Sequence, residues 1–250
     1  MKTIISGEIK SIYDWYCKAP PKDRNTQWKD DYSAKEFAKL WFDEKAGVTI
    51  PTEIRELIEK KVGIGEFEVL FAIPEHETPL DSFRGGQRNH DMFLFCRKQS
   101  GEIFIVCIEA KVAESLDATI EEKLNSAQNN QDSKIPQRID QMKWLLNMNK
   151  ADVSSLRYQL FTGMVGTVRE AEKYNARECL FLVLQIRPSR DVKKEIDGNR
   201  KSIEDFLTAN GAKEIFREGD RSFASELNCS NSNLRAILGY LTINKKPSTV

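Results

Sequence analysis

The chain has 250 residues, of which 40% are hydrophobic and 30% are charged, a composition typical of a globular protein with its own core. Lysine plus arginine and aspartate plus glutamate each number 38, so the net charge is zero and the global basic field of many nucleic-acid-binding proteins is excluded. Any anion site must therefore come from a local patch of positive charge or from a metal ion.

The numbers and positions of cysteine and histidine indicate the cellular compartment and limit the kinds of metal site that the protein could have. The five cysteines lie far apart and form no CxxC pair, which favours free thiols in a reducing compartment, so we expect a cytoplasmic protein. Two histidines are too few for a histidine-rich metal site. The N-terminus lacks the pattern of a signal peptide, and no apolar run approaches the length of a membrane span, so no membrane partner is expected.

The first part of the chain predicts two helices and one strand. The stretch YSAKEFAKLWFDE has helical spacing, and Ser33 with Glu36 matches a capping box. The stretch PTEIRELIEKKVG predicts a second helix that Gly63 ends. The stretch FEVLFAIP predicts a strand ended by Pro74, and EHETPLDSFRGGQRNH then reads as a loop.

The later elements begin with a predicted β-hairpin, formed by DMFLFC and IFIVCIEAK around the turn RKQSGE. The polar segment 116–133 is expected to form a partly mobile helix or lid. A helix is predicted in PQRIDQMKWLLNM, and one covered on most sides in SSLRYQLFTGMVGTVREAEKY. The stretch CLFLVLQI predicts an inner parallel strand, and NRKSIEDFLTANG a capped helix ended by glycine. The remainder is expected to form short α or β pieces, with Trp41 and Trp144 in the core.

These elements predict one α/β domain over residues 31–243. An irregular N-terminal extension, residues 1–30, contains the turn-rich stretch APPKDRN, and residues 244–250 are expected to form a flexible tail. No internal repeat and no second composition class indicates another domain.

Charged residues interrupt the second strand of the hairpin, where the chain should still be packing. Since strand side chains alternate between faces, Glu109 and Lys111 point to one face and Ala110 to the other. Two registers of the hairpin are compatible with its turn, and they place Asp91 opposite either Ile108 or Glu109. In the second register the Cβ atoms of the two acids lie roughly 4.5–5.5 Å apart, so the carboxylates repel unless a cation separates them.

A divalent cation with oxygen ligands suits that register. Mg²⁺ (or Mn²⁺) takes one or two carboxylates together with waters and substrate phosphate oxygens. The ion would neutralise a phosphate and lower the pKa of a bound water. Lys111 would position or help to deprotonate that water, or stabilise the charge of the transition state. The alternative is a solvated strand end with an ion pair that contributes little.

The stretch HDMFLF followed by VCIEAK resembles the Asp…Glu-x-Lys signature of the PD-(D/E)xK nuclease superfamily, with Asp91, Glu109 and Lys111 at the matching positions. WKDDYSAKEFAKLWF and LRYQLFTGMVGTV add a looser likeness to bacterial proteins placed in that superfamily, and the resemblance covers roughly residues 33–190. It implies a restriction-endonuclease-like α/β core, with a mixed central sheet flanked by helices, and metal-dependent hydrolysis of phosphodiesters. The sequence departs from the pattern at His90, which stands where the superfamily has proline.

The resemblance implies a metal bound by Asp91, Glu109 and the backbone carbonyl of Ala110, with Lys111 assisting the water. It also implies a supporting polar residue on the following helix, where Arg157 and Gln159 match. A further acidic ligand often lies on the first helix of the superfamily. The candidates for an additional acid, which stay open, are Glu36, Glu53, Glu56, Glu75 and Glu114.

Other positive residues and His90 have two interpretations each. Arg84 and Arg88 lie on a glycine-flexed loop beside the site, as phosphate contacts or as part of an ordinary solvated loop. The basic stretch RPSRDVKKEIDGNRK is interspersed with acids, which favours a solvated helix face over a DNA contact. His90 could serve as a base, but a partly exposed loop histidine is the expected reading.

The sequence as a whole predicts a Mg²⁺-dependent phosphodiesterase, above all a DNA endonuclease that acts through Asp91, Glu109 and Lys111. One alternative is a nuclease-like module that binds nucleic acid or a protein without cutting, and another is hydrolysis of a different phosphate ester. Substrate specificity, DNA against RNA, the number of metal ions, the pathway and the oligomeric state, a homodimer included, stay open.

Overall fold

A computed structural model describes residues 9–43, 47–130, 132–214 and 219–246 of the chain. Six strands form the main sheet: β3 Phe67–Pro79, β4 Gln87–Lys98, β5 Ile103–Lys111, β6 Glu178–Arg187, β7 Ser222–Leu227 and β8 Arg235–Asn244. Two short strands, β1 Phe42–Asp43 and β2 Gly47–Val48, form a separate pair. The helices are α1 Ile12–Lys18, α2 Arg24–Gln27, α3 Ser33–Leu40, α4 Thr52–Glu56, the π-helical turn η1 Leu57–Lys61, α5 Ile120–Gln128, α6 Ile135–Leu145, α7 Tyr158–Lys173 and α8 Lys193–Asn210.

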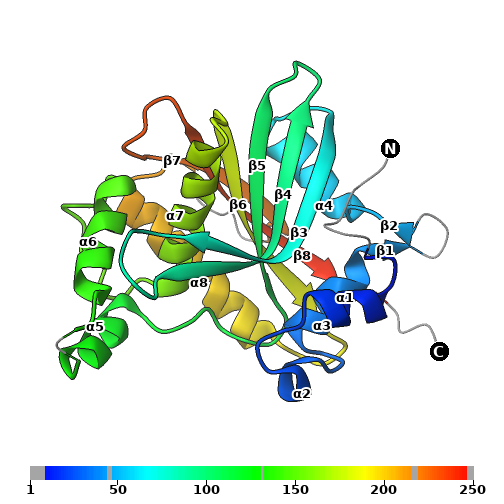
Figure 1. Ribbon diagram of the computed structural model, residues 1–250, viewed down its shortest axis with the longest axis horizontal. Coiled ribbons are helices and arrows are strands. Elements are labelled where there is room, and N and C mark those ends of the chain that lie inside the picture. Colours follow the sequence, from blue (N-terminus) through cyan, green and yellow to red (C-terminus); the bar gives the residue numbers. More distant parts are fainter. Residues whose placement is uncertain (1–8, 44–46, 131, 215–218, 247–250) are drawn as a thin grey trace.

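The main sheet is mixed, with the strand order β3-β4-β5-β6-β8-β7. Strands β3, β4 and β5 pair antiparallel, β6 pairs parallel with both β5 and β8, and β7 returns antiparallel to β8. Helices lie on both faces of the sheet, as Figure 1 shows. The predicted α/β class, with a mixed central sheet flanked by helices, is therefore confirmed.

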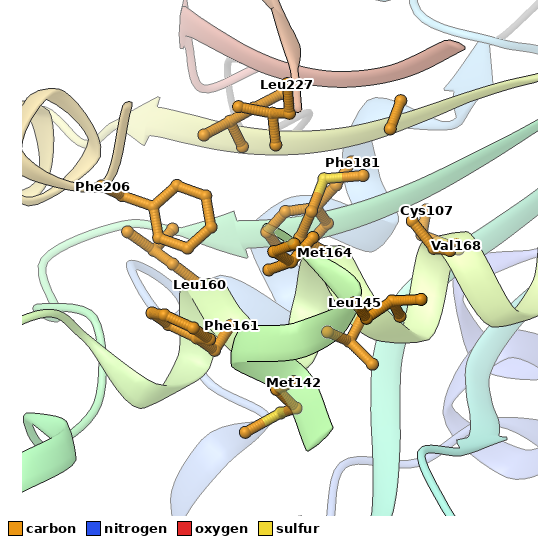
Figure 2. Packing of buried hydrophobic residues seen from close by; sticks show 14 of the residues in the cluster. Cys107, Met142, Leu145, Leu160, Phe161, Met164, Val168, Phe181, Phe206 and Leu227 are labelled. Atoms are coloured by element: carbon orange, nitrogen blue, oxygen red, sulfur yellow. The ribbon is translucent and has the colours of Figure 1, made fainter. Parts of the chain in front are cut away.

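Two hydrophobic layers enclose the sheet because its central strands are covered on both faces. On one side Cys107 of β5 and Phe181 of β6 pack near Met164 and Val168 of α7 (Figure 2). On the other side the alternate residues of these strands pack against the N-terminal helices, α4 included. This double coverage explains the unbroken apolar run of β6.

Burial of the aromatic core residues supplies much of the stability. Phe161 and Phe206 are fully buried, with ring centroids 5.2 Å apart in an edge-to-face arrangement. Full burial of one such side chain stabilises the fold by about 1.5–3 kcal/mol. Trp41 is fully buried as predicted, whereas Trp144 is 60% exposed, so its predicted place in the core is wrong. The core side of α6 is instead occupied by the buried side chains Ile139, Met142, Leu145 and Leu146 near its end.

Strands β3 and β4 form a long hairpin where a strand and a loop were predicted. Strand β3 continues past Pro74 to Pro79. Most of the expected loop is therefore paired in strands, and the last pair is Pro79 with Gln87. Pro74 is tolerated because β3 is an edge strand, where a missing N–H costs no ladder hydrogen bond. The prediction that Pro74 ends the strand is therefore wrong.

The far part of this hairpin turns away from the sheet. Glu75 has a φ of 50°, and the regular pairing of β3 with β4 passes over it. Beyond that point residues 76–90, here called the arm, cross over α7 towards α6 (Figure 1). At the tip of the arm, Arg138 of α6 donates to the buried carboxylate of Asp81, with Nε 2.5 Å from Oδ2.

Several local expectations at the N-terminal side need correction. Residues 12–18 and 24–27 form two short helices within the segment predicted to be irregular, and Trp15 packs edge-on against Phe37. Helix α3 begins at Ser33, but the capping box fails because its N-cap is Tyr32, which makes no side-chain capping bond. The π-turn after α4 does end before Gly63, whose φ of 76° suits glycine.

The C-terminal part contains more regular structure than predicted. Helix α8 begins at Lys193, well before the predicted start, and ends at Gly211 in the left-handed conformation. Strand β8 is a central strand rather than a short piece, because it lies between β6 and β7. Part of the expected tail, residues 247–250, lies outside the described residues, as does residue 131 of the expected lid. No described helix combines the length and apolar character that crossing a membrane requires.

Candidate functional site

A cleft lies at the point where β5 ends and β4 bends into the arm. It has a volume of about 530 Å³, and Asp91, Glu109, Ala110 and Lys111 line it. The pairing of Met92 with Ile108 belongs to the register in which Asp91 comes level with Glu109. The structure therefore brings together the acids of both hairpin strands and the lysine, in the second of the two registers considered.

Glu109 is almost completely buried and has three donors around it. The ammonium of Lys111 lies 2.7 Å from Oε1, and Gln159 of α7 donates to the same oxygen at 2.6 Å. The guanidinium of Arg88 donates to Oε2. Burial alone would raise the pKa of Glu109, but the positive charges of Arg88 and Lys111 outweigh burial and lower it. Glu109 is thus held as a carboxylate.

Asp91 is in the opposite electrostatic situation. Its Oδ2 accepts a hydrogen bond from the backbone N–H of Ala110 at 2.6 Å, which fixes the carboxyl beside the end of β5. Burial, followed by the negative charges of Glu109 and Glu75, raises the pKa of Asp91 well above its usual range. A cation between these acids would relieve that repulsion.

Glu75 is a third acid at this cleft. It lies at the bend of the hairpin, where Asn89 donates to its Oε2 at 2.5 Å. Burial and the nearby charge of Glu109 raise the pKa of Glu75 to about 7. Glu75, Asp91 and Glu109 therefore line one cleft, and the pKa values of Glu75 and Asp91 are raised.

Lys111 is a buried cation rather than a neutral amine. Burial would lower the pKa of its ammonium, but the charges of Glu109 and Asp91 raise it above the usual lysine value. Its side chain remains only partly accessible from the cleft. In this arrangement Lys111 offers positive charge and hydrogen-bond donors.

Of the five further acids considered from sequence, two line the cleft and three do not. Glu75 and Glu114 line the cleft. Glu114 also accepts the backbone N–H groups of Val112 and Ala113, at 3.0 and 2.8 Å, and so shapes the chain after β5. The three acids that do not line the cleft are Glu36, which is buried on the inner side of α3, and Glu53 and Glu56, which are exposed on α4.

The two candidates on the helix after the hairpin have different positions. Gln159 contacts Glu109 and also accepts the N–H of Asp117 at 3.2 Å. Arg157 is the N-cap residue of α7, and its guanidinium donates to the carbonyl of Asp117 at 3.2 Å. Only Gln159 therefore touches an acid of the cleft.

The two arginines of the predicted loop also separate. Arg84 is exposed at the tip of the arm, whereas Arg88 is buried within the arm against Glu109. His90 is fully buried near Phe181 and α7, so the expectation of a partly exposed loop histidine is wrong. The reason is the arm itself, because a paired hairpin folded over α7 covers one face of residues that a free loop would expose.

Sequence reasoning missed a pair of buried amides behind the cleft. Gln185 of β6 donates to the carbonyls of Lys111 and Val112, at 3.2 and 2.6 Å. Asn199 of α8 donates to Gln185 at 3.1 Å and accepts the N–H of Leu116 at 2.9 Å. The sequence signal that could have revealed them is the glutamine in the apolar run CLFLVLQI, because a buried amide needs hydrogen-bond partners.

The donor set of the cleft fits a hard divalent cation. Within the described ranges, no group of three or more His, Cys, Asp or Glu side chains could hold a metal by itself. Mg²⁺ does not need one, because it commonly takes one or two carboxylates and completes its shell with water and substrate oxygens. Asp91, Glu109 and the carbonyl of Ala110 are oxygen donors of this kind, and burial together with the charges of Glu109 and Glu75 disfavours the ionised form of Asp91 as long as no cation offsets them.

Comparison with known proteins places the chain in a family. Among curated proteins no match to the chain is found. One family model, described as a domain of unknown function (DUF6946), matches residues 8–243. That range includes α1 to α8 and almost all of the main sheet, together with every residue of the cleft named above. The chain therefore belongs to the DUF6946 family.

Proposed function

We propose that the protein is a Mg²⁺-dependent phosphodiesterase, and most specifically a DNA endonuclease. The observation that carries the proposal is the convergence of Asp91, Glu109 and Lys111 in one cleft at the end of β5. Two acids from paired strands and a buried ammonium form the arrangement that the resemblance to PD-(D/E)xK nucleases implies. The central mixed sheet is compatible with a restriction-endonuclease-like core.

Asp91, Glu109 and the carbonyl of Ala110 would hold the metal. Mg²⁺ when bound supplies a Lewis acid that neutralises phosphate charge and lowers the pKa of a coordinated water. Asp91 is oriented for this role by the N–H of Ala110, and Glu109 by Gln159 and Arg88. Their rotamers are therefore set before any ligand enters, which reduces the cost of organising the site.

Lys111 is best suited to bind charge. As a protonated ammonium it stabilises the negative charge that develops on a phosphate during attack. It also holds Glu109 in place through their contact of 2.7 Å. Of the roles considered for this lysine, charge stabilisation is the one that its raised pKa favours.

A plasmid-nicking assay tests the proposal. We expect supercoiled DNA to be nicked with Mg²⁺ and left intact with EDTA, and Asp91→Asn and Lys111→Met to lose at least a hundred-fold in rate. Glu121→Gln, an exposed acid on α5, is the matched control and should cut like the wild type. Equal nicking by wild type and Lys111→Met, in preparations with the same melting temperature, would show that the cleft is not the active site.

A binding module without cleavage is the second candidate. The observation that favours it is the pairing of Glu109 with both Arg88 and Lys111. These two cations balance the negative charge of the carboxylate without a metal. Calorimetric titration with Mn²⁺ separates the two functions. Uptake that Asp91→Asn abolishes supports the phosphodiesterase, whereas no heat at millimolar Mn²⁺ supports the module. Cleavage assays on single-stranded DNA, RNA and nucleotide esters would then define the substrate.

A further inference from the structure

The cleft is also lined by residues that the proposed chemistry does not use. Lys22, Tyr32 and Arg190 line it, and they come from the segment before α2, the start of α3 and the loop after β6. All three side chains are exposed. A single cleft thus joins an acidic centre to an aromatic ring with two cations.

Tyr32 has the properties of a stacking surface. Its side chain is 47% exposed, so the ring is not taken up by packing in the core. No aromatic ring of the described residues lies against it, in contrast to Trp15, Phe37 and Trp41 nearby, which pack on one another. The face of this ring is therefore available to a group that enters the cleft.

The turn that presents Tyr32 is tied down on both sides. Asp31 has a φ of 65°, which is unusual for a residue other than glycine and persists only where the surroundings impose it. Its N–H donates to the buried carboxylate of Glu36 at 2.9 Å, and its Oδ1 accepts from Lys245 at 2.6 Å. Lys39 holds Glu36 in turn, at 2.9 Å. This explains the buried Glu36: it anchors the turn and thereby holds Tyr32 at the cleft.

The geometry points to single-stranded nucleic acid as the substrate class, with an unpaired base stacked on Tyr32 and flanking phosphates on Lys22 and Arg190. This inference rests on the proposed function, because it places the phosphodiester at Asp91 and Glu109. A base inside a duplex is stacked on both faces and cannot offer one to a ring in a cleft, whereas an unpaired base can, so supercoiled plasmid would be nicked where its strands are locally unpaired. The volume of about 530 Å³ suits a nucleotide-sized group, since small-ligand sites have roughly 300–1,000 Å³.

The distribution of charge in the cleft agrees with the binding of a single strand. The acidic centre of the cleft would repel phosphates except at a metal, while Lys22 and Arg190 offer local positive charge on a chain with zero net charge. A strand passing through the cleft would thus be held by its phosphates at the rim and by one base on the ring. This combination of stacking and backbone contact is the usual mode for single strands.

Fluorescence anisotropy with a labelled oligothymidylate and a duplex of equal length, both in EDTA, tests the inference without cleavage. We expect the wild type to bind the single strand at least ten-fold more tightly than the duplex. Tyr32→Ala should lose about five-fold to a hundred-fold of the single-strand affinity, which is the range that stacking of one base on an aromatic ring contributes. Tyr32→Phe should keep the affinity, and Tyr32→Leu, which fills the same space without an aromatic face, should not.

Tyr13 provides the matched control, since it is 73% exposed and does not line the cleft. Tyr13→Ala should bind like the wild type. Arg190→Ala and Lys22→Ala should each reduce the slope of log affinity against log salt by about 0.7, the value for one phosphate contact on a single strand. Single-strand affinity that Tyr32→Ala leaves unchanged, or equal affinity for the duplex, would overturn the inference.

The two proposals fail in distinguishable ways. If Tyr32→Ala binds and cuts like the wild type, the stacking assignment is wrong and the phosphodiesterase stands. If the wild type never cuts with Mg²⁺ but loses single-strand binding in Tyr32→Ala, the catalytic assignment is wrong and the cleft is a single-strand binding site.

Discussion

The guanidinium of Arg88 donates to the carboxylate of Glu109, and both side chains are buried. Arg88 lies on the arm and Glu109 on the central strand β5, so this contact joins the folded-back hairpin to the floor of the cleft. The arm is therefore part of the site's construction, because it supplies one of the two cations that keep Glu109 ionised.

Removal of Arg88 should cost stability as well as activity. Arg88→Ala leaves a buried carboxylate with fewer partners, although Lys111 and Gln159 remain, so we expect a loss of about 2–4 kcal/mol in the free energy of unfolding. Arg84→Ala, on the exposed tip of the same arm, should change it by less than about 0.5 kcal/mol. Urea denaturation measures both. Similar stabilities for the two variants would contradict the assigned contact.

The amides behind the cleft should position the end of β5. Asn199→Leu removes the donor to Oε1 of Gln185 and the acceptor for the N–H of Leu116, which should cost about 1–3 kcal/mol in stability. Nicking should slow, because Gln185 holds the backbone at Lys111. Asn125→Ala, an exposed amide on α5, serves as the control. A stable Asn199→Leu protein with full activity would argue against this positioning role.

Close packing at the arm's tip makes Gly86 sensitive to substitution. A Cβ added there would lie 1.9 Å from Nη2 of Arg138, whose guanidinium is held by Asp81. Gly86→Ala should therefore lower stability by about 1–3 kcal/mol through overpacking. Gly198→Ala is the matched control, because a Cβ at this position in α8 meets open space, and it should raise stability by about 0.5–1 kcal/mol. Thermal melting of both variants checks the opposite signs.

The contact of the arm with α7 should make stability depend on pH. Glu170 accepts from His76 at 3.0 Å and from Thr78 at 2.8 Å. Burial would raise the pKa of Glu170, but these hydrogen bonds outweigh it and lower the pKa. A lowered pKa contributes stability above the unfolded value, near 4.5, and that stability is lost as pH falls through the folded value.

Glu170→Gln tests this dependence. The variant should be less stable at pH 7, by about 1–3 kcal/mol, and should lose less stability than the wild type between pH 6 and pH 3. Glu172→Gln, which removes a half-exposed pair with Arg169, should follow the wild-type curve. Parallel acid unfolding curves for Glu170→Gln and the wild type would exclude Glu170 as the group responsible.

Local sequence patterns determined the central strands and the main helices. Alternation and apolar content placed β5 and β6, and the helical spacing and the glycine stop placed α7 and the end of α8, because periodicity reports which side of an element is buried. The same alternation put Glu109 and Lys111 on one face. The sequence allowed two registers of the hairpin. The structure has the one that brings Asp91 level with Glu109.

Only the tertiary structure decided how the arm folds and what surrounds the acids. The stretch around Arg88 and His90 is rich in loop-forming residues, and it becomes a paired hairpin buried on one face because α7 and α6, from elsewhere in the chain, cover that face. The place of Tyr32 at the cleft likewise depends on Glu36 and Lys245, the second of which lies at the far end of the sequence. Local propensity does not encode contacts between residues so distant in the chain, since their energy appears only when the packed elements bring them together.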